Sequence, residues 1–149
     1  GHKEITGWWK DTGLADDLLL ANKMLLERME GSEFPNHGSI YESADISGNV
    51  RIGIGSVIGK SVKITGPAII GENCVLENCE VGPFITIGSG TEVKDAKLRD
   101  NIILENCDIN CDIQITDSLI GRGVKIVKKK TKEAEGHKMI VGDKTILEL

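Results

Sequence analysis

The amino-acid sequence predicts an all-β protein, a parallel β-helix built from six-residue repeats, with one short helix before it. From residue 40 to residue 126 an aliphatic residue recurs in fifteen steps, eleven of six residues and four of five. Neither the 3.6-residue period of a helix nor the alternation of an ordinary strand gives this spacing. Two residues earlier the side chain is usually small or branched, and Asn101 is the main exception. The aliphatic series is Ile40, Ile46, Ile52, Ile58, Ile64, Ile70, Leu76, Val81, Ile87, Val93, Leu98, Ile103, Ile109, Ile115, Ile120 and Ile126.

This spacing fits a three-sided prism whose flat faces are short strands. One aliphatic side chain per face points inward and three repeats make a turn, so about five turns fit between residues 40 and 126. Aromatic residues are only 3% of the chain, which suits flat layers of Ile, Val and Leu. Glycines such as Gly53, Gly71 and Gly88 follow the aliphatic position, where we expect a sharp bend. The ends of such a column need covers, and the flanking segments are the natural ones.

Residues 1–31 contain the expected helix, and residues 32–39, with Pro35 and Gly38, are expected to form a linker. Thr12 or Asp11 can cap the start of the helix, and Gly31 suits its end. Apolar residues three or four apart form one face of the helix. They are Leu14, Leu18, Ala21, Leu25 and Met29.

Residues 127–149 form a tail with two parts. A polar, lysine-rich loop comes first, followed by two short apolar runs around Gly142 and Asp143, which predict a C-terminal hairpin. The four lysines of residues 128–132 could hold a phosphate, but Glu133 and Glu135 follow at once. A solvated loop is the better interpretation.

Charge and hydropathy exclude several classes of partner. The net charge is −5, and acidic and basic residues are interspersed, so the sequence predicts no positively charged surface that would bind nucleic acid. The sequence shows no apolar run near the ~20 residues that cross a bilayer and no charged-then-apolar leader, so we expect no membrane contact and a cytoplasmic location.

The cysteines and histidines are the residues most open to a catalytic or metal-binding interpretation. Cys74, Cys79 and Cys107 occupy the small inward position, and no cysteine pair has the two-residue gap of a zinc knuckle, so we expect compact core side chains. A histidine serves as general base in many hexapeptide-repeat acyltransferases. His37 and His137 lie outside the repeats, and no long loop interrupts the repeats to hold an acyl donor.

The opening segment carries a more specific motif. Residues 8–13 read Trp-Trp-Lys-Asp-Thr-Gly and lead into the acidic helix of residues 16–22. This stretch resembles the end of the catalytic domain of sugar-1-phosphate nucleotidylyltransferases, most closely the long glucose-1-phosphate thymidylyltransferases with a hexapeptide-repeat β-helix. The resemblance continues through the repeats to residues 136–138 and 141–143. It implies a left-handed β-helix, and it makes residues 1–31 the end of a catalytic domain plus its helix.

The resemblance also implies a reaction. In that family a sugar 1-phosphate oxygen attacks the α-phosphorus of a nucleoside triphosphate, giving a nucleotide-sugar and pyrophosphate. The aspartate of the motif, Asp11 here, is one of two carboxylates that hold Mg²⁺; the alternative is that Asp11 only caps the helix. The family's glycine-rich nucleotide loop and first metal-binding aspartate are missing from this sequence. We therefore expect them, together with the contacts that select sugar and nucleotide, before Lys3 in a parent enzyme, and no catalytic residue and no cofactor in this chain alone; the sequence assigns no substrate-binding residue.

Two other functions stay open at this point. One is an acyl-CoA-dependent acyltransferase, alone or as a second activity, and the other is a purely structural trimeric β-helix protein. The expected role of the chain is an assembly or scaffold domain. Val57, Ile69 and Ile102 are expected to point outward from neighbouring layers. Such an apolar face would pair with copies of itself, so we expect a homo-oligomer, a trimer first.

Overall fold

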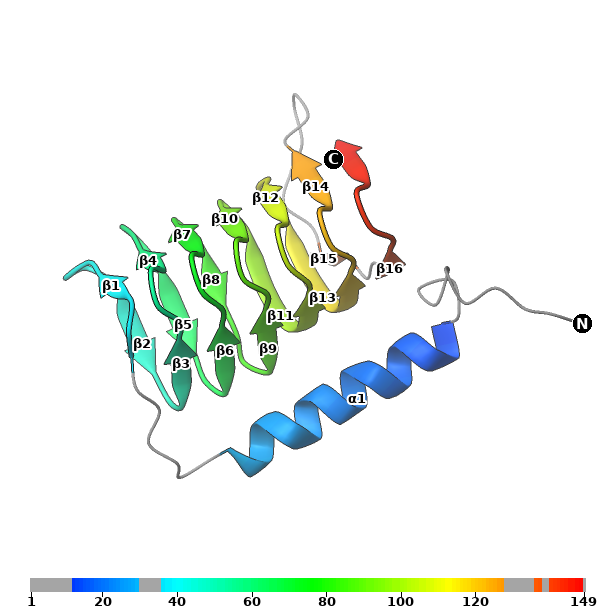
Figure 1. Cartoon of the computed structure of the whole chain (residues 1–149), viewed down its shortest axis with the longest axis horizontal. Helices are drawn as coiled ribbons and strands as arrows, with labels where there is room; N and C mark the ends of the chain where they lie inside the picture. Colours follow the sequence, from blue (N-terminus) through cyan, green and yellow to red (C-terminus); the bar gives the residue numbers. More distant parts are fainter. Residues whose placement is uncertain (1–11, 30–35, 128–135, 138–139, 149) are drawn as a thin grey trace, which may run out of the picture.

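The computed structural model of the chain describes residues 12–29, 36–127, 136–137 and 140–148. Helix α1 (Thr12–Arg28) precedes a column of parallel strands, a β-solenoid of about six turns. Figure 1 shows the strands stacked in chain order along the column, from β1 near one end to β16 near the other. The predicted class and the five turns between residues 40 and 126 are confirmed.

The column has three faces, each a stack of parallel strands. Face 1 consists of β1 (Ser39–Ile40), β4 (Val57–Ile58), β7 (Val75–Glu77), β10 (Glu92–Lys94), β12 (Asp108–Asn110), β14 (Lys125–Val127) and β17 (Ile146–Glu148). Face 2 consists of β2 (Asp45–Ser47), β5 (Lys63–Thr65), β8 (Glu80–Val81), the first halves of β11 (Lys97–Ile103) and β13 (Gln114–Ile120), and β15 (Gly136–His137). Face 3 consists of β3 (Val50–Ile52), β6 (Ala68–Ile70), β9 (Ile85–Ile87), the second halves of β11 and β13, and β16 (Ile140–Val141).

The core occupies the inside of the prism, as the repeat predicts. All fourteen aliphatic positions from Ile52 to Ile126 are buried. Ile40 and Ile46 are more exposed because they belong to the first coil of the described column. The small inward positions from Ser56 to Val124 are buried as well. The strands of successive coils pair in register through their backbone N–H and C=O groups, so equivalent inward side chains stack on one another along the column.

The four five-residue steps of the repeat correspond to shortened corners. Each contains an Asn or Asp at positive φ: Asn78 (47°), Asp95 (64°), Asp100 (54°) and Asp117 (49°). With one residue fewer, the chain turns through the left-handed region, which Asn and Asp tolerate better than other non-glycine residues. At Asp100 and Asp117 the strand continues through the corner, which gives β11 and β13 their seven residues.

Gly82, after Val81, has the positive φ (91°) that a sharp bend implies, but most glycines after the aliphatic position have a different cause from the one predicted. Gly53, Gly71 and Gly88 do not have positive φ. Instead they lie against the next coil: a Cβ at Gly88 would stand 2.6 Å from the backbone nitrogen of Glu105. Close backbone approach, rather than a left-handed bend, therefore excludes a side chain there. In the same turn it is Gly90, two residues later, that has positive φ.

The predicted C-terminal hairpin is wrong. β15 and β16 pair in parallel with β13, and β17 pairs in parallel with β14, so the tail adds another turn to the column. Val141 is in register with Ile120, and Leu147 with Ile126. A hairpin would leave the outer backbone groups of β13 and β14 unpaired, whereas a further coil satisfies them.

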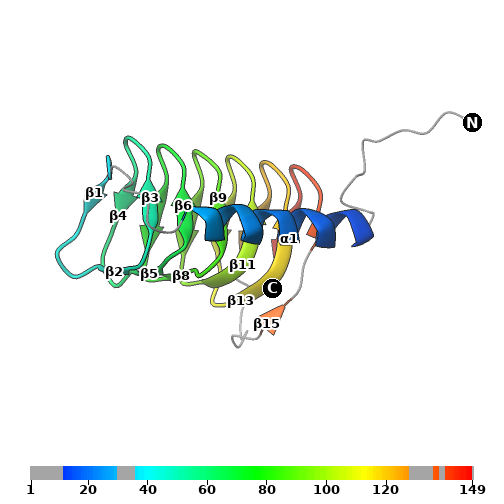
Figure 2. The same cartoon turned by 90° about the horizontal axis from the view of Figure 1, so that it is seen from below.

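Helix α1 is confirmed, but it lies along the side of the column rather than over its end (Figures 1 and 2). Ala15 and Leu26 are its buried residues. The predicted apolar face is largely exposed, with Leu18 38% and Leu25 60% exposed. The predicted apolar residues do share one side of the helix, but that side faces away from the column. No helix in the described ranges is long and apolar enough to cross a membrane.

Candidate functional site

Helix α1 covers face 3, and this contact is the most distinctive feature outside the repeats. Thr86 on β9, Ile102 on β11 and Leu119 on β13 are outward side chains of face 3, and the helix contacts all three strands. Leu119 is outward yet only 1% exposed, because the helix lies over it. The Thr86 hydroxyl donates a hydrogen bond of 2.7 Å to Oδ1 of Asn22. The helix is therefore attached to the column by apolar and polar contacts together.

A cavity of about 220 Å³ lies between the helix and the corner that joins faces 2 and 3. Lys23 Nζ stands 4.6 Å from the ring centroid of Phe84, within the range of a cation–π contact. Asp100 and Asp117 complete one wall. Burial raises the pKa of Asp100 above its usual value; Lys23 opposes this rise and Asp117 adds to it. Lys23 thus places a positive charge near two stacked carboxylates and fastens the helix to the corner.

A second, more open cavity of about 400 Å³ lies on face 2. Its lining includes Glu80, Lys97 and Arg99, and the first two form an ion pair of 3.4 Å between half-exposed side chains. Exposed pairs of this kind contribute little to stability. Within the described part of the chain, no group of three His, Cys, Asp or Glu side chains is placed to hold a metal ion.

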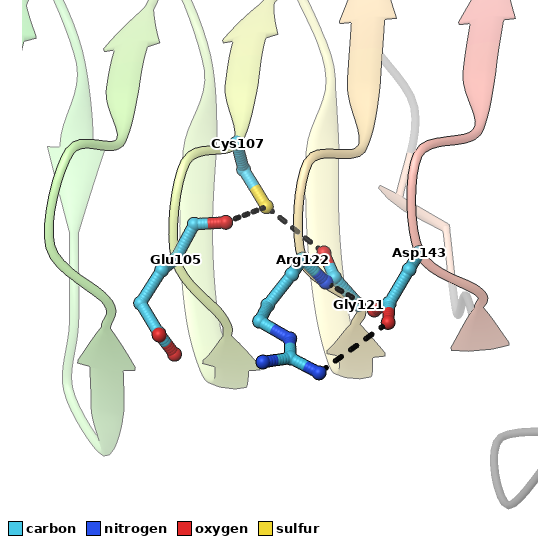
Figure 3. Close-up of polar contacts among 5 residues, drawn as sticks. All are labelled: Glu105, Cys107, Gly121, Arg122 and Asp143. Atoms are coloured by element: carbon cyan, nitrogen blue, oxygen red, sulfur yellow. Dashed lines mark hydrogen bonds and ion pairs between the residues drawn. The ribbon is translucent and has the colours of Figure 1, made fainter. Parts of the chain in front are cut away.

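The cysteines serve the core, as predicted. Cys107 Sγ donates to the carbonyl oxygen of Gly121 at 3.0 Å and lies 3.8 Å from that of Glu105, at a corner between neighbouring coils (Figure 3). Arg122 pairs with Asp143 of the added coil at 3.8 Å on the outside of the same corner. All four cysteines are buried thiols, and none of them forms a disulfide.

Burial also makes the thiols less reactive, because it disfavours the thiolate form. It raises the pKa of Cys79 to about 12 and that of Cys107 to about 11, and it raises the pKa of Cys74 as well. The thiolate is the nucleophile and the metal ligand, so these groups are poor candidates for either role near neutral pH.

The remaining predicted site residues do not come together. Asp11 lies outside the described residues, directly before α1. His37 is exposed at the start of the column, where its backbone N–H donates to the carbonyl oxygen of Ile52 at 3.1 Å. His137 belongs to β15, in the last coil. Sequence reasoning missed the cation–π contact of Lys23 with Phe84 and the position of Lys23 in the cavity beside Asp100; the Asp at a five-residue step was the available signal.

The fold and these contacts define a class: a hexapeptide-type β-solenoid with a helix docked on one face. No protein-family model matches the chain. The chain is 31% identical over 145 residues to glucose-1-phosphate thymidylyltransferase of Streptomyces antibioticus, and the match covers 97% of this chain and 39% of the relative. It is 31% identical over 140 residues to the enzyme of the same name from Streptomyces griseus, covering 93% of this chain and 38% of the relative.

A third relative comes from an archaeon. The chain is 27% identical over 146 residues to the low-salt glycan biosynthesis nucleotidyltransferase of Haloferax volcanii, covering 97% of this chain and 40% of the relative. The chain spans about two fifths of the length of these relatives and matches their C-terminal part. The similarity predicted from the opening motif and the repeats is confirmed.

Proposed function

We propose that the chain is the C-terminal β-solenoid domain of a sugar-1-phosphate nucleotidylyltransferase of the glucose-1-phosphate thymidylyltransferase type. The observation that supports this most is continuous similarity across 93–97% of the chain, from the opening segment through the coils, to two enzymes of that name. A solenoid match alone would indicate only a fold, because unrelated functions share repeat architectures. Here the segment before the helix matches as well.

The chemistry would take place mainly in a part of the protein that precedes this chain. A sugar 1-phosphate oxygen would attack the α-phosphorus of the nucleoside triphosphate, and pyrophosphate would leave. Mg²⁺ would offset the charge that gathers on the phosphates, with Asp11 as the carboxylate that this chain supplies.

The described residues would help to position Asp11 in the complete protein. Asp11 immediately precedes α1, which begins at Thr12. The helix is fixed to face 3 by the burial of Ala15 and Leu26 and by the hydrogen bond from Thr86 to Asn22. In the complete protein a fixed helix starting at the next residue would help to hold the Asp11 backbone in place, and positioning of this kind lowers the entropic cost of assembling a site.

Assembly and location are further parts of the proposal. We infer a cytoplasmic homo-oligomer, a trimer first. The three side chains expected to form one apolar face do not share a face: Ile69 and Ile102 are on face 3, which the chain's own helix contacts, and Val57 is on face 1, so a copy would use face 1. Face 1 presents half-buried Val57 and Val75 in neighbouring coils. Sedimentation equilibrium that gives three times the 16.1 kDa chain mass supports the trimer, and a monomer at all concentrations contradicts it.

The experiment for the catalytic proposal uses the product of the complete reading frame. We expect it to release pyrophosphate from a nucleoside triphosphate, dTTP first, in the presence of glucose 1-phosphate and Mg²⁺. Asp11→Asn in that protein should abolish most turnover, whereas the matched change Asp108→Asn on face 1 should not. Absence of turnover with all common nucleoside triphosphates and sugar 1-phosphates would refute the proposal.

A further inference from the structure

Helix α1 carries a solvent-facing apolar patch that the solenoid does not cover. The patch consists of Leu18 (38% exposed), Ala21, Met24 (48%) and Leu25 (60%). The last three lie three, six and seven positions after the first, so all four share one side of the helix. That side lies roughly a quarter to a half turn round the helix from Ala15 and Leu26, which face the column.

The patch is unusual for a helix that already has a packing partner. A surface helix normally buries one apolar stripe and exposes polar residues on the other side. Here the stripe that the sequence predicts as the packing face is the exposed one, while Asn22 and Lys23 take part in the contact with the column. Two sides of one helix are therefore suited to contact protein, and only one has its contact within the described part of the chain.

The size of the patch decides which occupant fits it. Four side chains are far fewer than the roughly 20–30 residues that each partner contributes to a stable standard-sized interface. A second copy held by this patch alone would dissociate. A domain joined to the helix by a short segment needs much less contact, because tethering gives effective concentrations in the millimolar range.

We propose that the patch is the docking surface for the domain that precedes α1 in the parent protein, so that one helix is packed between the two domains. This inference rests on the proposed function, because the relatives are about two and a half times as long as this chain and match it at their C-terminal part. A helix held on both sides fixes the catalytic domain, and with it Asp11, relative to the column.

Thiol labelling tests the docking with two aliphatic side chains of nearly equal exposure. Leu25→Cys lies in the patch, and Ile54→Cys lies on the column, outside the helix; Ile54 is 61% exposed, nearly the same as Leu25. The four native thiols are buried and three have raised pKa values, so a maleimide at pH 7 reports on the new cysteine. Each variant is prepared in the 149-residue chain and in the complete gene product, and labelling is followed by intact mass.

We expect Leu25→Cys to label at least about tenfold more slowly in the complete protein than in the 149-residue chain, with Ile54→Cys equal in both. Equal rates for Leu25→Cys would overturn the proposal. So would a labelling rate in the shorter chain that falls as the concentration of that chain rises, because the occupant would then be a second copy.

Pyrophosphate release is measured on the same samples. Turnover by a complete Leu25→Cys protein that labels rapidly refutes the docking alone, whereas absence of turnover in the unsubstituted protein refutes the proposed function.

Discussion

Asn101 is the one polar amide at an inward position where the repeat favours a small or branched residue, and its replacement gives the sharpest test of the fold. The side chain is fully buried in β11 and bonds the next coil twice. Its Nδ2 donates to the carbonyl oxygen of Ile115 at 3.0 Å, and its Oδ1 accepts from the backbone N–H of Ser118 at 3.0 Å. The amide thus pairs two backbone groups where β13 turns its corner.

Asn101→Leu keeps the approximate size of the side chain and removes both hydrogen bonds. Each buried backbone group left without a partner costs about 1–3 kcal/mol, and the burial of leucine offsets part of this sum, so we expect the free energy of unfolding to fall by about 2–4 kcal/mol. Urea unfolding followed by circular dichroism measures it. The control is Asn110→Leu, the same change at an exposed position of β12, with an expected effect within about 0.5 kcal/mol. Equal stability of the two variants would refute the role given to the Asn101 amide.

Four further outcomes follow from the same structure. Gly88→Ala should lower the free energy of unfolding by about 1–3 kcal/mol, because its Cβ would meet the nitrogen of Glu105; an unchanged urea midpoint would contradict the close approach. Cys107→Ala should cost only about 1 kcal/mol, and bound zinc that disappears with the thiol would overturn its structural role. The contribution of Cys79 to the free energy of unfolding should be constant below pH 9 and decline as pH rises toward 12. The reason is that the folded Cys79 thiol, with a pKa of about 12, stays protonated where the unfolded thiol, with a pKa of 9.0, ionises. Cys79→Ala should flatten the dependence of melting temperature on pH over that range, and an unaltered decline would count against this cause. The 149-residue chain alone, given glucose 1-phosphate, dTTP and Mg²⁺, should release no pyrophosphate above background, and measurable turnover would refute the need for a preceding domain.

The inward positions of the column could be predicted from the sequence because every repeat meets the same physical requirement. An inward aliphatic side chain is needed once per face, so Ile64, Ile87 and Ile109 can be identified from spacing alone. The steps of five residues are visible too. The left-handed Asn or Asp at each shortened corner is a matter of backbone angles that the sequence does not display, and Asn73 and Asn106 adopt the same conformation in six-residue steps.

The orientation of α1 and the path of the tail could not be predicted in the same way. Leu18 and Leu25 form the more hydrophobic stripe, but the helix side that packs on face 3 contains Ala15, Leu26 and Asn22, and Asn22 is bonded to the outward Thr86. In the tail, the lysine-rich residues 128–135 interrupt the repeat, so the six-residue step from Val141 to Leu147 resembles two strands of a hairpin. Long-range pairing, rather than local spacing, decides both outcomes.

In the candidate site, too, some residues can be identified from the sequence while their surroundings cannot. Asp11 can be identified through a motif, but its environment depends on residues that precede it. The cation–π contact of Lys23 with Phe84 and the cavity that Lys23 shares with Asp100 join segments about sixty to eighty residues apart, and no local pattern links them.

Whether this solenoid completes a nucleotidylyltransferase is decided by sequencing the coding region immediately upstream of Lys3. We predict an open reading frame that continues upstream through a domain longer than this chain. Near its start that domain should contain a glycine-rich loop of the Gly-Gly-x-Gly-Thr-Arg-Leu kind directly after an apolar strand, a pattern that cradles nucleotide phosphates. A start codon directly before Lys3, or an upstream domain without that loop, would contradict the proposed function.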